Sequence, residues 1–172
     1  MDIVIQIIGF LGIGLSLFSF RFKKHKHILL FRTINEMIFI IQYFLLGAFS
    51  GVFLNILGCI RNSIFSRRVE KNKDTKVLMI VFSLLFTAFG ILTFEGIESI
   101  VLILAKVLST VAYGNKNTTV LRIISFLTHI GYLLYNAAVF SLAGMLSDTL
   151  ILISLFVAIA RFDVYPKLKE KN

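Results

Sequence analysis

Long apolar runs separated by short clusters of basic residues constrain the fold of this chain more than any other feature. A helix needs roughly 17–25 mostly apolar residues to cross the hydrocarbon core of a membrane. Seven runs meet or approach that length, and Gly51–Ser66 is the shortest of them: Ile3–Phe20, Ile28–Phe49, Gly51–Ser66, Val77–Phe94, Ile97–Gly114, Val120–Phe140 and Gly144–Arg161. The runs are continuous rather than alternating, which favours helices over a β-barrel. We therefore predict an all-α polytopic membrane protein with seven transmembrane helices.

The first apolar run, Ile3–Phe20, is expected to be a retained span. A cleaved signal peptide carries basic residues before its apolar segment. Here Arg21, Lys23, Lys24 and Lys26 follow the run, and Asp2 precedes it.

The basic residues occur in alternate connections between the predicted spans. Lysine and arginine cluster in residues 21–27, 67–76, 115–119 and 161–172, whereas the turns near residues 50, 95–96 and 141–143 contain neither. Basic connections face the cytoplasm, so we expect the N-terminus outside and the C-terminus inside. The formal net charge of +9 then suits anionic lipid at the basic loops, and no nucleic-acid partner is expected.

A shift of 93 residues places the first, second and third spans on the fifth, sixth and seventh. In each half, a first helix ends in a basic loop and a second helix meets a third through a tight turn that contains glycine. The fourth span has no counterpart and is interpreted as a linker. Because a single linker span gives the second half the same orientation as the first, the two three-helix repeats are expected to be parallel. The expected organisation is a first bundle at 1–67, a loop and linker helix at 68–95, a second bundle at 96–163 and a basic tail at 164–172.

Several short motifs carry a resemblance to a known family. They are Phe44-Leu45-Leu46-Gly47, Ile60-Arg61, Val107-Leu108-Ser109-Thr110 and Asn136. On these residues, the chain resembles the YgjV family of bacterial inner-membrane proteins over nearly its whole length. The resemblance implies location in the bacterial plasma (inner) membrane, and it supplies a fold more than a function.

The three-plus-one-plus-three plan also looks like that of the SWEET and PQ-loop carriers. Two features depart from those groups. The predicted spans contain no proline to act as a hinge, and Gln42 follows Ile41 rather than a proline. Proline-hinged movement is therefore not carried over to this chain.

Four ionisable residues stand out within the predicted spans, where each costs about 2.5–3.5 kcal/mol or more without a partner or a cavity. They are Glu36, Arg61, Lys106 and Asp148. Glu36 and Lys106 each lie eight residues from the cytoplasmic end of a span, which predicts equal depth and a possible pair. Asp148 is the alternative partner of Lys106. Arg61 is expected to extend its guanidinium toward the cytoplasm. The alternative is that Arg61 contacts an anion at the inner mouth of the bundle with the help of Asn62.

Polar residues recur on helical faces in both halves. Under the 93-residue shift, Glu36 falls on His129, Gln42 on Tyr135 and Asn55 on Asp148. Such a set would line a cavity between two bundles and offer donors and acceptors to a polar substrate. Interhelical hydrogen bonding is the simpler alternative for each residue taken alone. The predicted substrate-binding residues are Asn35, Glu36, Gln42, Asn55, Asn62, Lys106, His129, Tyr135, Asn136 and Asp148.

The parallel repeat and the paired polar positions favour a carrier for a small polar metabolite, and the motif content disfavours an enzyme. There is no nucleophile–base motif, no phosphate-binding glycine loop and no metal-ligand spacing, and Cys59 is the single cysteine. We expect no cofactor and no bound metal. The alternative function is a non-transporting membrane receptor or scaffold on the same fold.

Overall fold

The structure is a computed structural model that describes residues 25–164 of the chain. This part is all-helical, with no strand between residues 25 and 164. Six α-helices are followed by a short π-helix, η1: α2 His25–Leu46, α3 Phe49–Glu70, α4 Lys76–Leu92, α5 Ile97–Gly114, α6 Thr118–Ala138, α7 Leu142–Ile159 and η1 Ala160–Val164. Six predicted spans are thus helices. The first predicted span, Ile3–Phe20, lies outside the described residues, so the described layout has six helices rather than seven.

The helix α3 differs most from its predicted length. The apolar run ends at Ser66, but the helix has 22 residues and continues to Glu70. Arg67 and Arg68 occupy its last turn, where basic side chains stabilise the negative end of the helix dipole. The prediction that the third span is the shortest was wrong, because α4 has only 17 residues.

Four of the described helices are long and apolar enough, by length and composition, to cross a membrane. They are α2, α5, α6, and α7 continued to Asp163. The helix α4 is apolar but shorter. At about 1.5 Å per residue, 18–22 residues extend about 27–33 Å, which matches a hydrocarbon core of about 30 Å.

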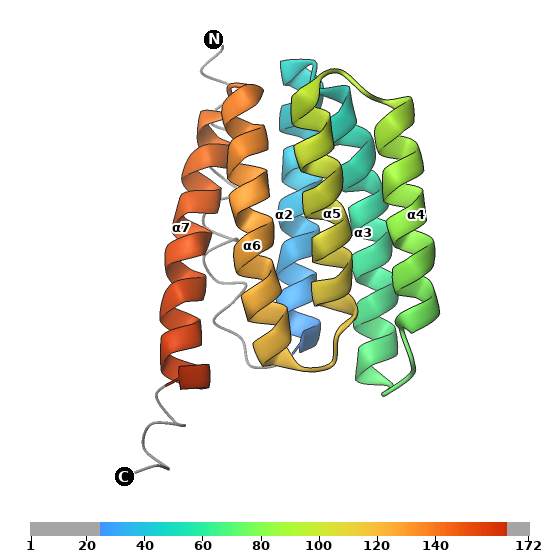
Figure 1. Cartoon of the computed structure of the whole chain (residues 1–172), viewed down its shortest axis with the longest axis vertical. Coiled ribbons are helices and arrows are strands. Elements are labelled where there is room, and N and C mark those ends of the chain that lie inside the picture. The colour runs from blue at the N-terminus through green and yellow to red at the C-terminus, as the bar shows by residue number, and fades with distance from the viewer. Residues whose placement is uncertain (1–24, 165–172) are drawn as a thin grey trace.

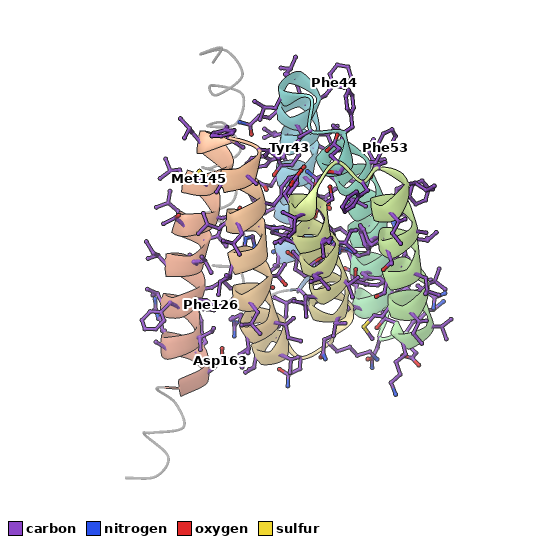
Figure 2. All side chains as sticks on the ribbon, turned by 45° about the horizontal axis from the view of Figure 1, so that its top comes forward. Tyr43, Phe44, Phe53, Phe126, Met145 and Asp163 are labelled. Atoms are coloured by element: carbon purple, nitrogen blue, oxygen red, sulfur yellow. The ribbon has the colours of Figure 1, made fainter. Side chains whose placement is uncertain are left out.

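Many apolar side chains face outward and many polar side chains are buried, which is the reverse of the arrangement in a water-soluble protein. Large apolar residues are exposed on every helix, and the most exposed include Val77, Leu92 and Ile97. Buried polar and charged residues are about as numerous as buried apolar ones in the described part. The neighbours Tyr43 and Phe44 illustrate the division, since Tyr43 is 5% exposed and Phe44 is 61% exposed (Figure 2). Such an exterior is suited to lipid rather than to water.

The helices alternate in direction and gather the basic connections at one end of the bundle (Figure 1). Contacts across this end join Lys26 to Glu70 at 3.0 Å and Lys116 Nζ to the Asn72 carbonyl at 2.9 Å. At the same end, the Lys76 N–H donates to Asp74 and holds the pKa of that carboxyl below its usual value. The opposite end contains Glu95 and Glu98.

The 93-residue shift is visible in the backbone. Moving α2 by 93 residues gives 118–139, against the observed Thr118–Ala138, and moving α3 gives 142–163, against α7 with η1. The connecting turns also match. Gly47 and Phe140 have positive φ angles of 73° and 54°, and a 2.9 Å hydrogen bond closes each turn, Ala48 N to Tyr43 O and Ser141 N to Asn136 O. The α2–α3 and α6–α7 hairpins are therefore equivalent in register.

Candidate functional site

A small cavity lies at the centre of the bundle, between the two hairpins. Its volume is about 30 Å³, which accommodates roughly two water molecules. Five helices contribute to its wall: Arg32, Asn35, Glu36, Phe39 and Tyr43 from α2, Asn55 from α3, Leu102 and Lys106 from α5, Tyr132 and Asn136 from α6, and Ser147 and Asp148 from α7. Most of these side chains are polar or charged, so the cavity is suited to a polar occupant.

Glu36 holds two cations on one side of the cavity. Its Oε1 atom lies 3.5 Å from Lys106 Nζ and 3.4 Å from Arg61 Nη2. Lys106 also donates to Asn55 Oδ1 at 2.6 Å and lies over the ring of Tyr132 at 5.3 Å. Lys106 therefore has a carboxylate, an amide oxygen and the face of an aromatic ring as partners.

Gly58 provides the space that Glu36 occupies. The helix α3 passes so close to the carboxylate that a Cβ atom at Gly58 would overlap Glu36 Oε2. The glycine is required by this close approach of helix and carboxylate. It therefore belongs to the site, although it contributes no functional group.

Arg61 is fully buried with an exposed fraction of 0%, so the prediction that it extends toward the cytoplasm was wrong. The physical reason is a complete set of interior acceptors. Its guanidinium donates to Asn62 Oδ1, Ser109 Oγ, Thr110 Oγ1 and the Lys106 carbonyl at 2.6–3.3 Å. Its Cζ atom also lies 5.1 Å and 4.9 Å from the ring centres of Phe86 and Tyr113. These interactions replace water around the charge.

Asp148 forms the corresponding centre in the second hairpin. Its Oδ1 lies 2.6 Å from His129 Nδ1, and its Oδ2 accepts from Asn136 Nδ2 at 2.7 Å. Of the two carboxylates considered for Lys106, Glu36 is the one in contact, and Asp148 is bound instead by residues of its own hairpin. In this contact His129 and Asp148 occupy the positions equivalent to Glu36 and Asn55.

Equivalent residues of the two hairpins contact one another beside the cavity. Tyr43 Oη donates to Asn136 Oδ1 at 2.7 Å, and these residues are 93 positions apart. This contact joins positions of the α2–α3 and α6–α7 hairpins that correspond under the 93-residue shift.

Glu95, from the α4–α5 connection, contacts the start of α3 at the far end of the first hairpin. Its carboxylate accepts from the N–H groups of Phe49 and Ser50 at 2.9 and 3.2 Å, and so caps α3. The equivalent start of α7 is capped by its own Ser141, whose Oγ accepts from Gly144 N at 3.1 Å. Ala48 stands in the first hairpin where Ser141 stands in the second, which explains why α3 needs a cap from elsewhere in the chain.

Comparison with protein families decides the identity of the chain. The family Imp-YgjV, described as a bacterial inner membrane protein, matches residues 3–165. The chain belongs to this family. Searches of curated proteins and of solved structures gave no match.

Membership in the Imp-YgjV family agrees with the apolar exterior of the helices. The family is one of bacterial inner membrane proteins, and the described helices of this member are suited to a multi-pass arrangement there. The charged cavity thus lies in a membrane-embedded bundle, where buried ionisable residues mark functional sites more often than in a water-soluble core.

The structure brings together most of the predicted site residues at the cavity wall. Those in the wall are Asn35, Glu36, Asn55, Lys106, Asn136 and Asp148. The other four predicted residues stand behind it. Asn62 holds Arg61, His129 holds Asp148, Gln42 accepts from Ser141 at 3.3 Å, and Tyr135 lies 3.3 Å from the Ser50 hydroxyl.

Sequence reasoning missed six residues that line the cavity: Arg32, Phe39, Tyr43, Leu102, Tyr132 and Ser147. A signal for three of them was present on α2. Arg32, Glu36, Phe39 and Tyr43 are spaced by four, three and four residues, which places them on one helical face. Choosing residues by polarity alone hid this face, because two of its members are aromatic.

Proposed function

We propose that the protein is a carrier for a small polar metabolite in the bacterial inner membrane. The observation that supports it is the central cavity, which is lined by Glu36, Lys106 and Asp148 and lies between the two equivalent hairpins. Carriers built from internal repeats bind their substrates at the interface of the repeats, near the middle of the membrane. A volume of about 30 Å³ holds only part of a metabolite, so transport requires the hairpins to move apart.

In this proposal residues 3–20 supply a seventh helix equivalent to α5. The chain then has the three-plus-one-plus-three plan of the SWEET and PQ-loop carriers, with two parallel three-helix repeats joined by α4. The expected bundles are residues 1–67 and 96–163. The helix count is tested by cysteine labelling of single-cysteine variants from each side of the membrane, with Cys59→Ala as the background.

The basic end of the bundle faces the cytoplasm in this proposal, with the N-terminus outside and the C-terminus inside. Lysine and arginine are retained on the cytoplasmic side, where anionic lipids attract them. Periplasm-specific and cytoplasm-specific reporters fused to the two ends test this orientation. Both reporters active in the same compartment would contradict it.

The transport proposal is tested by uptake into proteoliposomes. Lys106→Ala and Glu36→Ala should each reduce uptake of the transported solute at least tenfold, because both side chains line the cavity. Lys116→Ala is the matched control, because Lys116 contacts Asn72 in the connection at the basic end. Uptake that survives both cavity substitutions unchanged excludes these residues from transport.

A second candidate function is a non-transporting receptor or scaffold. The interior acceptors around Arg61 favour it, because a network this complete also serves as a fixed structural element. In that case the basic connections would bind a cytosolic partner or anionic lipid. Unchanged cross-linking between α2 and α6 under all solute conditions, together with no uptake, would support this second function over the first.

A further inference from the structure

The two buried acids beside the cavity differ in the kind of partner that holds them. Glu36 contacts Arg61 at 3.4 Å and Lys106 at 3.5 Å. An arginine keeps its positive charge at every physiological pH, so Arg61 neither takes up nor releases a proton. Asp148 contacts His129 at 2.6 Å instead, and histidine is the side chain that ordinarily changes its charge between about pH 5 and 8. The first hairpin thus contains a fixed ion pair, and the second contains a pair that can bind a proton.

The position of the His129–Asp148 pair gives protons access to it. Asp148 lines the central cavity, and His129 lies behind it and is fully buried. The cavity of about 30 Å³ accommodates roughly two water molecules, which is enough to deliver a proton. A hydronium ion passes its proton to the pair and leaves a water molecule, so the pair changes from one negative charge to neutral. The other two histidines, His25 and His27, lie in the first turn of α2.

We infer that the protein couples transport to protons and that the His129–Asp148 pair is its proton-binding site. This inference rests on the proposed carrier function and names its coupling ion. Among the described residues, charged and titratable groups face the pair from three helices: Arg32, Glu36 and Tyr43 on α2, Lys106 on α5 and Tyr132 on α6. The predicted first span, residues 3–20, contains no ionisable side chain.

These surroundings set the direction of the coupling. With Asp148 ionised, the pair on α6 and α7 attracts the cations Arg32 and Lys106, which line the cavity from α2 and α5. Protonation neutralises the pair and weakens this attraction across the cavity. A proton that binds better to the open form than to the closed form shifts the equilibrium toward the open form. Acidic pH should therefore open the cavity between the hairpins.

The test measures how fast a cysteine in the cavity wall is alkylated by N-ethylmaleimide at different pH values. Leu102→Cys places a thiol in the wall, in the full-length protein with Cys59→Ala and in proteoliposomes. Because a thiol reacts faster at higher pH, each rate is divided by the rate of the same cysteine in His129→Gln at the same pH. This ratio should rise at least about tenfold from about pH 8 to about pH 5.5, since one proton shifts an equilibrium up to about tenfold per pH unit. A ratio that does not change with pH would overturn the inference.

Two further variants locate the response. Asp148→Asn keeps the shape of the side chain and removes its charge, so it replaces His129→Gln as the reference if that variant does not fold. His27→Gln removes a histidine from the first turn of α2, away from the cavity, and should keep the full rise in the ratio. A flat ratio in His27→Gln would place the response at the basic end and overturn the assignment to His129.

Solute uptake separates this inference from the carrier proposal. If alkylation depends on pH but no sugar, amino acid or nucleoside is taken up, the proton site is supported and transport is contradicted. If uptake is the same with and without an inward proton gradient and the alkylation ratio is flat, transport is supported and the proton site is contradicted.

Discussion

The α2–α3 and α6–α7 hairpins share a register and a turn, yet they hold their buried acids in different ways. In the first hairpin the acid is Glu36 on α2, which contacts Arg61 and Lys106. In the second it is Asp148 on α7, which is bound by His129 and Asn136. The acid therefore lies on the first helix of one hairpin and on the second helix of the other, although the two hairpins share a register and a turn.

A second comparison concerns the basic end of the same hairpins. Lys26 and Glu70 pair at 3.0 Å in the first hairpin. The equivalent positions in the second are Thr119 and Asp163, joined by a 2.6 Å hydrogen bond. At this end the acid stays on the same side of the hairpin. The acid thus changes helices at the centre, where the cavity lies, but not in this pair at the basic end.

The largest effect is expected at Glu36. Glu36→Gln leaves Arg61 and Lys106 as buried cations without their carboxylate, and should lower the free energy of unfolding by about 3–5 kcal/mol. The measurement is unfolding in mixed micelles by circular dichroism.

The equivalent substitution, His129→Gln, is the matched control for Glu36→Gln. It removes a hydrogen bond to Asp148 but no charge in the neutral form, and should cost about 1.5–3 kcal/mol. Equal losses at the two positions would show that the hairpins are energetically alike and that the ion cluster is not special.

Overpacking at the paired glycines comes next. A Cβ atom at Gly51 would lie 2.6 Å from Tyr135 Oη, and one at Gly144 would overlap Asn136 Oδ1. Each change to alanine should cost about 1–3 kcal/mol in the free energy of unfolding. Ser63→Ala on the exposed face of α3 should stay within about 0.5 kcal/mol. A loss at one glycine alone would mean that only one hairpin is tightly packed.

Moving the acid tests whether its two positions are interchangeable. Asn55→Asp combined with Glu36→Gln reproduces in the first hairpin the acid placement of the second. Lys106 Nζ already lies 2.6 Å from Asn55 Oδ1, so the new carboxylate should recover about 0.5–3 kcal/mol of coupling free energy in a double-mutant cycle. A coupling free energy of zero would show that the acid works only from α2.

The smallest effect is expected at the turns. The backbone of Phe140 has a left-handed conformation, and the residue is 73% exposed. Phe140→Gly therefore relieves about 1–2 kcal/mol of backbone strain. The greater entropy of glycine in the unfolded chain offsets about 0.4–1 kcal/mol of this gain. The net gain in the free energy of unfolding should be about 0.5–1 kcal/mol. Gly47→Ala should lose about 1 kcal/mol by the same physics. A loss at Phe140→Gly would indicate that the aromatic ring stabilises its turn.

Much of the helical fold was predictable because bilayer thickness fixes how long an apolar run must be. Ile97 and Gly114 are the predicted and observed ends of α5. The error at α3 arose because Arg67 and Arg68 end the apolar run but not the backbone hydrogen bonding. Helix ends follow caps and dipoles, which hydropathy does not report.

Part of the site was predictable for a similar reason. Glu36 and Lys106 were placed at the same depth by counting residues from one membrane face, and they are in contact. The depth of a residue does not reveal the direction in which its side chain points. Arg61 was therefore expected to reach water, whereas acceptors in the interior hold its guanidinium. The role of Gly58 depends on how two helices pack, and no local pattern encodes that.

The shortness of α4 has a consequence for the lipid around the protein. Its 17 residues extend about 25 Å, whereas a typical hydrocarbon core is about 30 Å thick. As a spanning helix, α4 would therefore thin the adjacent bilayer, or Lys76 would extend along the helix toward the headgroups. Thin bilayers with short acyl chains should therefore deform less around α4 than thick bilayers do.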